Sequence, residues 1–95
     1  MTLSNSTDDN KEYLNCRKAI VQFWAPWCGP CNNCEELNSL SIKNKLKIFR
    51  VNIEENPQLK IDNYIIMVPT YIVYENGKEI KRYFGNKDLS FIKRH

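Results

Sequence analysis

The sequence has no long apolar segment and no start that resembles a secretory leader. None of its hydrophobic runs reaches the length of a membrane-spanning helix. Residues 1–12 are polar and acidic, without the basic start and apolar stretch of a secretory signal. We therefore expect no membrane association and a reducing, cytoplasmic location.

The sequence also lacks any concentration of charge of one sign. Its formal net charge is +3, but lysines alternate with glutamates and aspartates, and no run of five like charges occurs. Because phosphate binding needs a clustered basic face, we expect no nucleic-acid partner. The single histidine, His95, stands at the last position and is not expected to act as a ligand or base.

The four cysteines are not spaced as a disulfide scaffold. Three of them crowd together at Cys28, Cys31 and Cys34, and only Cys16 stands apart. Disulfides that stabilise small domains close long loops, and pairs within this cluster would not. Redox or metal chemistry is the better interpretation of the cluster.

A chain of 95 residues makes one domain, residues 1–95, in which we expect residues 1–10 to be loose. Composition is that of a globular protein, at 42% hydrophobic and 26% charged residues. After a short helix over Asp9 to Cys16, strands are expected at Ala19 to Ala25, Lys47 to Ile53, Val68 to Tyr74 and Glu79 to Phe84, and helices at Cys28 to Lys43, Gln58 to Tyr64 and Lys87 to Arg94. The order predicts an α/β fold with a central mixed sheet and helices on its faces.

The chemistry is predicted at Cys28 and Cys31, which follow the apolar strand and open a helix. Only a thiolate attacks a disulfide, and a helix N-terminus stabilises an anion, so Cys28 is expected to be the nucleophile. Cys31, three positions later, is close enough to resolve a mixed disulfide on Cys28. Gly29 and Pro30 keep the intervening loop small. A structural zinc half-site has the same spacing, so the pair alone does not decide between redox and metal chemistry.

Three longer motifs make the chain resemble the thioredoxin family. They are VQFWAPWCGPC ending at Cys31, RVNIEENP at Arg50 to Pro57, and VPTYIVYENGKEI at Val68 to Ile80, followed by Gly85. Together they cover nearly everything from Ala19 onward. The resemblance implies a thioredoxin fold, here with a shortened N-terminal strand and helix, and a cycle of dithiol–disulfide exchange.

The resemblance also implies a surface that binds the substrate. Pro69 would follow a cis peptide bond and face Cys28, and Val68 would present its backbone to an extended substrate strand. Trp27, Phe84 and Gly85 would complete a flat apolar surface around the thiols. Trp24 is expected in the core, because it belongs to the buried strand.

Two positions depart from the family pattern. The family usually carries a buried aspartate in the proton-relay position, where this chain has Gln22, and Arg50 matches a position where a lysine often partners that aspartate. A glutamine does not titrate, so the general-base role is absent here or has moved to water or to another group. The second departure is Cys34, which we expect to be an inert core thiol. The alternatives for Cys34 are a third redox partner for Cys31 or a metal ligand. Cys16 is expected to be a packed or surface thiol that takes no part in the chemistry.

We therefore predict a protein-disulfide reductase of the thioredoxin type. It would act as a monomer on disulfide-containing client proteins, without a bound cofactor, and NADPH would enter only through a thioredoxin reductase. One alternative is a disulfide oxidant or isomerase of the same fold, which differs in redox potential. The other is a zinc-binding interaction module that uses Cys28, Cys31, Cys34 and Cys16.

Overall fold

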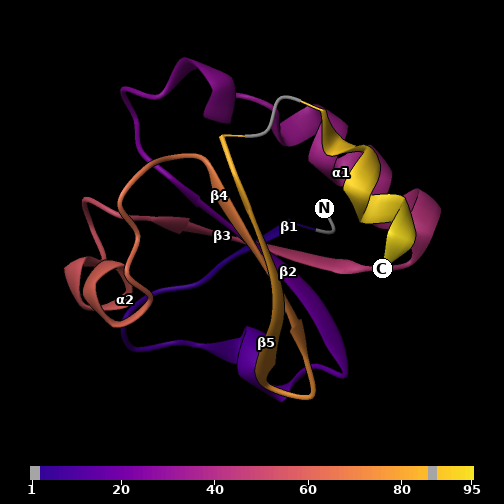
Figure 1. Cartoon of the computed structure of the whole chain (residues 1–95), viewed down its shortest axis with the longest axis horizontal. Coiled ribbons are helices and arrows are strands. Elements are labelled where there is room, and N and C mark those ends of the chain that lie inside the picture. The colour runs from indigo at the N-terminus through magenta and orange to yellow at the C-terminus, as the bar shows by residue number, and fades with distance from the viewer. Residues whose placement is uncertain (1–2, 86–87) are drawn as a thin grey trace.

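A mixed five-stranded sheet forms the centre of the computed structural model, which describes residues 3–85 and 88–95. Its strands are β1 (Leu3–Asn5), β2 (Lys18–Trp24), β3 (Lys47–Asn52), β4 (Thr70–Glu75) and β5 (Lys78–Phe84). They lie in the order β1-β3-β2-β4-β5, and Figure 1 labels each of them. β1, β3 and β2 run parallel, and β4 and β5 are each antiparallel to the preceding neighbour in this order.

Helices cover both faces of the sheet. The α-helices are α1 (Cys34–Asn44) and α2 (Pro57–Asp62), and the 3₁₀ helices are η1 (Glu12–Asn15), η2 (Gly29–Cys31) and η3 (Leu89–Arg94). α1 and η3 lie side by side on one face, whereas α2 lies on the other (Figure 1). Leu37 of α1 and Ile92 of η3 join one apolar cluster, and Leu59 of α2 joins a second. The predicted α/β fold with a mixed sheet is confirmed.

Strand β2 is buried on both faces, as its apolar sequence predicts. Residues 19–23 have no solvent exposure. Ile20 packs in the cluster under α1, and its neighbours Val21 and Phe23 pack in the cluster under α2. Gln22 is the one polar side chain in this stretch, and it needs hydrogen-bonding partners from within the protein.

Residues 3–8 form a strand and tertiary hydrogen bonds, where we expected residues 1–10 to be loose. Leu3–Asn5 forms the parallel edge strand β1 beside β3, and the amide of Ser6 donates to the Arg50 carbonyl over 2.9 Å. The Asp8 carboxylate then accepts a hydrogen bond from the Leu59 amide at 2.8 Å. The polar composition of this segment gives no sequence signal for a strand. β1 forms because it satisfies backbone groups along the outer edge of β3. The helix expected over Asp9 to Cys16 is reduced to η1.

The closing segment follows the prediction in its burial but not in its helix type. Leu89 and Ile92 are buried, as expected, but the segment forms the 3₁₀ helix η3. Lys87, where we placed the start of this helix, lies outside the described residues. Among the helices that the structure describes, none has the length and apolar character needed to cross a membrane.

The turn at Asn76 and Gly77 joins β4 and β5 as predicted. Both residues have positive φ angles, 53° at Asn76 and 81° at Gly77. A Cβ atom at Gly77 would lie 2.8 Å from the carbonyl oxygen of Leu14. Glycine is therefore required at this position for both its conformation and its small size.

We expect Gly77→Ala to lower the free energy of unfolding by about 1 to 3 kcal/mol, because the new methyl group meets the Leu14 backbone at an unfavourable φ angle. Urea unfolding followed by circular dichroism measures the change. Gly29→Ala is the matched control, because a Cβ there has no heavy atom within 4 Å. Equal stability of the two variants would contradict the prediction.

Buried tyrosines make a second prediction. Tyr13 and Tyr74 pack with ring centroids 4.8 Å apart, and the Tyr74 hydroxyl donates to Asn63 Oδ1 over 3.1 Å. Burial raises the pKa of Tyr74 and of Tyr13 above the ordinary value of 10.0. The folded state therefore keeps these protons at a pH where the unfolded chain loses them.

Stability should consequently fall as the pH rises above 10, by up to about 1.4 kcal/mol per pH unit for each such group. Unfolding in urea between neutral pH and about pH 11 tests this. Tyr74→Phe should make the fall shallower. Tyr64→Phe, at a side chain that is 81% exposed, should leave the fall unchanged. A fall as steep in Tyr74→Phe as in the parent would rule out this origin.

Candidate active site

Cys28 and Cys31 form a disulfide at the carboxyl end of β2. Their Cα atoms are 5.4 Å apart, within the range that disulfide geometry requires. Cys28 follows the short loop Ala25 to Trp27 and stands at the N-cap of η2. Cys28 is 5% exposed and Cys31 is fully buried, so the two sulfur-bearing residues differ in access to solvent.

The helix expected from Cys28 to Lys43 is interrupted. After the single 3₁₀ turn of η2, the chain passes through Asn32 and Asn33 before α1 begins at Cys34. Cys28 thus precedes a short turn and not the first turn of α1, and its own amide donates to the Ala25 carbonyl over 3.0 Å. The anion-stabilising effect that we assigned to a long helix therefore does not apply at Cys28.

Trp27, Gly29 and Pro30 form an exposed rim around the disulfide. Trp27 is 67% exposed, and its indole N–H donates to Glu54 Oε2 over 2.8 Å. Trp24, expected in the core, is half-buried and packs against the same apolar cluster as the cysteines. The two tryptophans therefore differ in exposure in the predicted direction.

The second predicted group, Val68, Pro69, Phe84 and Gly85, lies where β4 begins and β5 ends. The Val68–Pro69 peptide bond is cis, as the resemblance implies. Val68 packs against the cluster that contains both cysteines. The Gly85 amide donates to the Pro69 carbonyl over 2.7 Å, and Phe84, at the end of β5, is 51% exposed.

The sequence pattern did not single out two exposed side chains in this region, Ile66 and Met67. They are 89% and 47% exposed and directly precede Val68. Met67 Cε lies 3.4 Å from the position of a Cβ on Gly85, so the side chain reaches this predicted contact residue. The sequence did contain a signal for these contact residues, since two large apolar residues directly precede the cis-proline motif.

A polar cluster surrounds Gln22 next to Cys31. Gln22 Nε2 donates to the Tyr71 hydroxyl over 3.0 Å and to Asn33 Oδ1 over 2.9 Å, and Gln22 Oε1 accepts from Arg50 Nε over 2.6 Å. Asn33 Nδ2 also donates to the Tyr71 hydroxyl, over 2.9 Å. The second arm of Arg50 donates to the Cys31 carbonyl over 3.0 Å. Sequence reasoning did not identify Asn33 and Tyr71, because they lie within stretches read only as helix and strand.

Burial changes the proton affinities in this cluster. It raises the pKa of the Tyr71 hydroxyl and lowers the pKa of the Arg50 guanidinium. Arg50 also stacks on Trp24, with its Cζ atom 4.2 Å from the ring centroid. The side chains of Gln22 and Asn33 are amides, which do not titrate, so neither offers a carboxylate as a base.

Cys34 and Cys16 are unpaired and half-buried. Cys34 is thus less enclosed than the core thiol we expected, and Cys16 Sγ lies 3.6 Å from the Glu12 carbonyl. Within residues 3–85 and 88–95, no three histidine, cysteine, aspartate or glutamate side chains are grouped so that they could hold a metal ion. The zinc-binding alternative receives no support from this arrangement.

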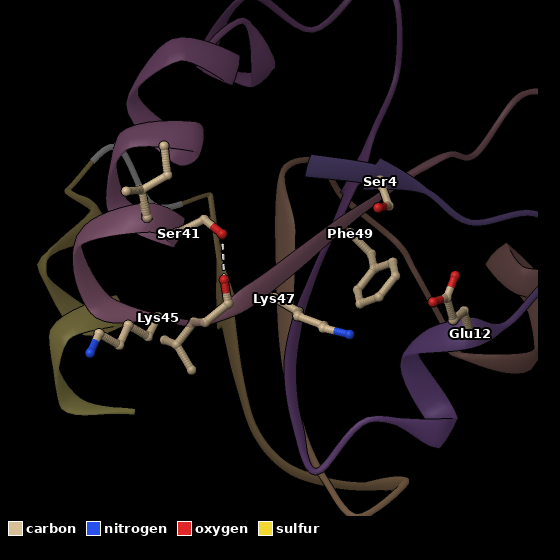
Figure 2. Close-up of a pocket in the computed structure, with 8 residues that line it drawn as sticks. Ser4, Glu12, Ser41, Lys45, Lys47 and Phe49 are labelled. Carbon is tan, nitrogen blue, oxygen red and sulfur yellow. Dashed lines mark hydrogen bonds between the residues drawn. The ribbon is translucent and has the colours of Figure 1, made fainter. Parts of the chain in front are cut away.

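A pocket lies at another part of the molecule (Figure 2). It is lined by Ser4, Glu12, Ser41, Ile42, Lys45, Leu46, Lys47 and Phe49. The Ser41 hydroxyl, labelled in Figure 2, donates a hydrogen bond to the Leu46 carbonyl. None of these residues belongs to the group around the disulfide, so the pocket plays no part in the chemistry described here.

Known proteins resemble the chain in both sequence and structure. The Thioredoxin family model matches residues 2–95. A thioredoxin of Griffithsia pacifica is 36% identical over 84 residues, which are 83% of this chain and 76% of that protein. A bifunctional thioredoxin reductase/thioredoxin of Mycobacterium leprae is 30% identical over 82% of this chain and 18% of its own length.

A solved structure agrees with the sequence relatives. The crystal structure of Chlamydomonas reinhardtii thioredoxin f2 superposes with a TM-score of 0.80 at 27% identity, over 86% of this chain and 82% of that one. Both share the fold that brings the sequence motifs around the Cys28–Cys31 disulfide. The chain belongs to the thioredoxin family and is a thiol–disulfide oxidoreductase.

Proposed function

We propose that the protein is a reductant of disulfides in client proteins, with Cys28 as the nucleophile and Cys31 as the resolving cysteine. The Cys28 thiolate attacks one sulfur of a client disulfide, which breaks that bond and forms a mixed disulfide. The Cys31 thiolate then attacks Cys28 Sγ, and the second client thiolate leaves. The client gains two electrons, and the Cys28–Cys31 disulfide remains.

The observation that carries these roles is the unequal exposure of a bonded pair. Cys28 borders the rim of Trp27, Gly29 and Pro30 and retains some exposure, whereas Cys31 has none. A client can approach Cys28 from outside, and only a group within the protein can reach Cys28 from the side of Cys31. The order of attack follows from this difference in access.

The client surface would extend from Trp27 across Val68 and Pro69 to Phe84 and Gly85. Exposed apolar side chains flank a half-buried Val68, whose backbone could pair with an extended client segment. Ile66 and Met67 enlarge this surface. Clients with apolar residues beside their disulfide should therefore be favoured.

A thioredoxin reductase would restore the dithiol with electrons from NADPH, so the chain itself needs no bound cofactor. The Mycobacterium leprae relative, whose name includes both activities, supports this partner. The protein would act as a monomer. Two further unpaired cysteines suit a reducing cytoplasm, in which the protein would act as an electron donor in cell redox homeostasis.

We expect the reduced protein to reduce insulin disulfides. Cys28→Ser should lower the rate by at least about three orders of magnitude, because Cys31, the remaining thiol of the redox pair, has no exposure to a client. Cys31→Ser should accumulate a mixed disulfide with the client. Turbidity and mass spectrometry measure the two effects. Cys16→Ser is the matched control and should retain the parental rate, and an inactive parent would refute the proposed function.

The redox potential separates a reductant from an oxidant or isomerase of the same fold. We expect a potential of about −270 mV, the value of thioredoxins, because Gly29 and Pro30 between the two cysteines favour a reductant. Equilibration with glutathione buffers, followed by thiol alkylation, measures it. A potential near the roughly −120 mV of a strong oxidant would assign the alternative function.

A further inference from the structure

The polar cluster next to Cys31 contains a positive charge whose neighbours are neutral. Arg50 donates to the Gln22 amide oxygen over 2.6 Å and to the Cys31 carbonyl over 3.0 Å, and it lies over the Trp24 ring. In the part of the chain that the structure describes, the ion pairs join Lys18 to Glu75 and Arg82 to Glu79. The guanidinium is therefore half-buried with amide, carbonyl and aromatic partners, an arrangement that leaves its charge uncancelled.

The fully buried Cys31 needs such a charge when the disulfide opens. In the resolving step its thiol must lose a proton, and burial in an apolar cluster disfavours the resulting thiolate. The usual remedy would be a base, but Gln22 cannot accept the proton. A cation near the thiol lowers its pKa instead, and the proton then leaves to water. The Arg50 guanidinium is held at this residue by its hydrogen bond to the Cys31 carbonyl, over 3.0 Å.

We propose that Arg50 is a positioning residue for the exchange reaction: its guanidinium, held by Gln22 and the Cys31 carbonyl, supplies the charge that stabilises the Cys31 thiolate in place of a general base. Gln22 contributes by orienting Arg50 without cancelling its charge. This inference rests on the proposed function, in which Cys31 is the resolving cysteine. The thiolate attacks Cys28 Sγ, the bond from Cys28 to the client breaks, and the departing client thiolate takes its proton from water.

Few other ionisable groups face this position among the described residues. Cys28 lies on the same turn, and Tyr71 projects from β4. From α1, Cys34 interacts electrostatically with Arg50 and Glu36 with Tyr71. The Tyr71 hydroxyl stays protonated through neutral pH, because burial raises its pKa. Arg50 is therefore the fixed positive charge of this group, and Cys34 must be removed before Cys31 can be titrated alone.

The test titrates Cys31 in a chain in which Cys16, Cys28 and Cys34 are replaced by serine. The ultraviolet absorbance of the thiolate is followed against pH. Adding Arg50→Met should raise the Cys31 pKa by about one unit or more. Arg50→Lys keeps the charge, so its Cys31 pKa should stay close to that of the parent. Arg82→Met is the matched control, because Arg82 contacts Glu79 and Asn63 and should leave the pKa unchanged.

A Cys31 pKa in Arg50→Met equal to that of the parent would overturn the proposal, as would equal pKa values in the lysine and methionine variants. If Arg50→Met does not fold, Arg50→Gln gives the answer, because its amide can still donate a hydrogen bond to Gln22 or to the Cys31 carbonyl but carries no charge. The Cys31 pKa should rise in this variant as well. An unchanged or lower pKa there would overturn the proposal.

Kinetics add an independent measurement in the chain with all cysteines present. Arg50→Met should slow release of the client from the mixed disulfide about tenfold at neutral pH, and its rate should rejoin the parental rate at a pH above the raised pKa. A deficit that persists at every pH would indicate a structural role and overturn the proposal. Failure of the parent to reduce insulin would refute the proposed function alone, because the titration does not depend on activity.

Discussion

Strand β2 has no face in contact with solvent, and the position of the whole site depends on that burial. The helices over both faces of the sheet exclude water from residues 19–23, which fixes the direction in which the strand leaves the core. Cys28 follows after a short loop and is therefore presented at one edge of the sheet. Parallel β3 and antiparallel β4 flank β2, so Arg50 and Tyr71 stand on either side of Gln22 by strand register. The buried strand β2 thus positions the redox pair that follows it, and it organises the polar cluster around Gln22.

The cost of this arrangement is the burial of polar groups, and hydrogen bonding offsets it. Gln22 makes three hydrogen bonds, to residues of β3, β4 and the turn before α1. An amide without these partners would lose about 1–3 kcal/mol in desolvation. The cluster also ties the Cys31 carbonyl to Arg50, and so connects the redox turn to the sheet. Stability and the local electrostatics of Cys31 consequently depend on the same side chains.

The parts of the fold that the sequence predicts are those with strong local patterns. The apolar run before Cys28, the alternation around Val51 and the Asn76-Gly77 turn each specify their element through burial or backbone conformation. Edge strand β1 could not be predicted, since three residues, two of them polar, form a strand only because β3 offers unpaired backbone groups. The break at Asn32 and Asn33 was missed for a similar reason, because Asn33 bonds to Gln22 and Tyr71 through tertiary contacts. The closeness of Cys28 and Cys31 can be predicted from their spacing, whereas a polar cluster assembled from three separate segments cannot.

The neutral character of the cluster has a consequence for how the site responds to pH. Amides do not titrate, an arginine stays charged at any physiological pH, and the buried hydroxyl of Tyr71 holds its proton more strongly than a free tyrosine. A carboxylate at the position of Gln22 would titrate in the same range as a perturbed thiol, and the two protons would then be coupled. With Gln22 in its place, the charge around Cys31 stays constant while the cysteines titrate. In the proposed exchange cycle, the thiols themselves would then set the pH dependence, because the charge proposed to act on Cys31 does not titrate near neutral pH.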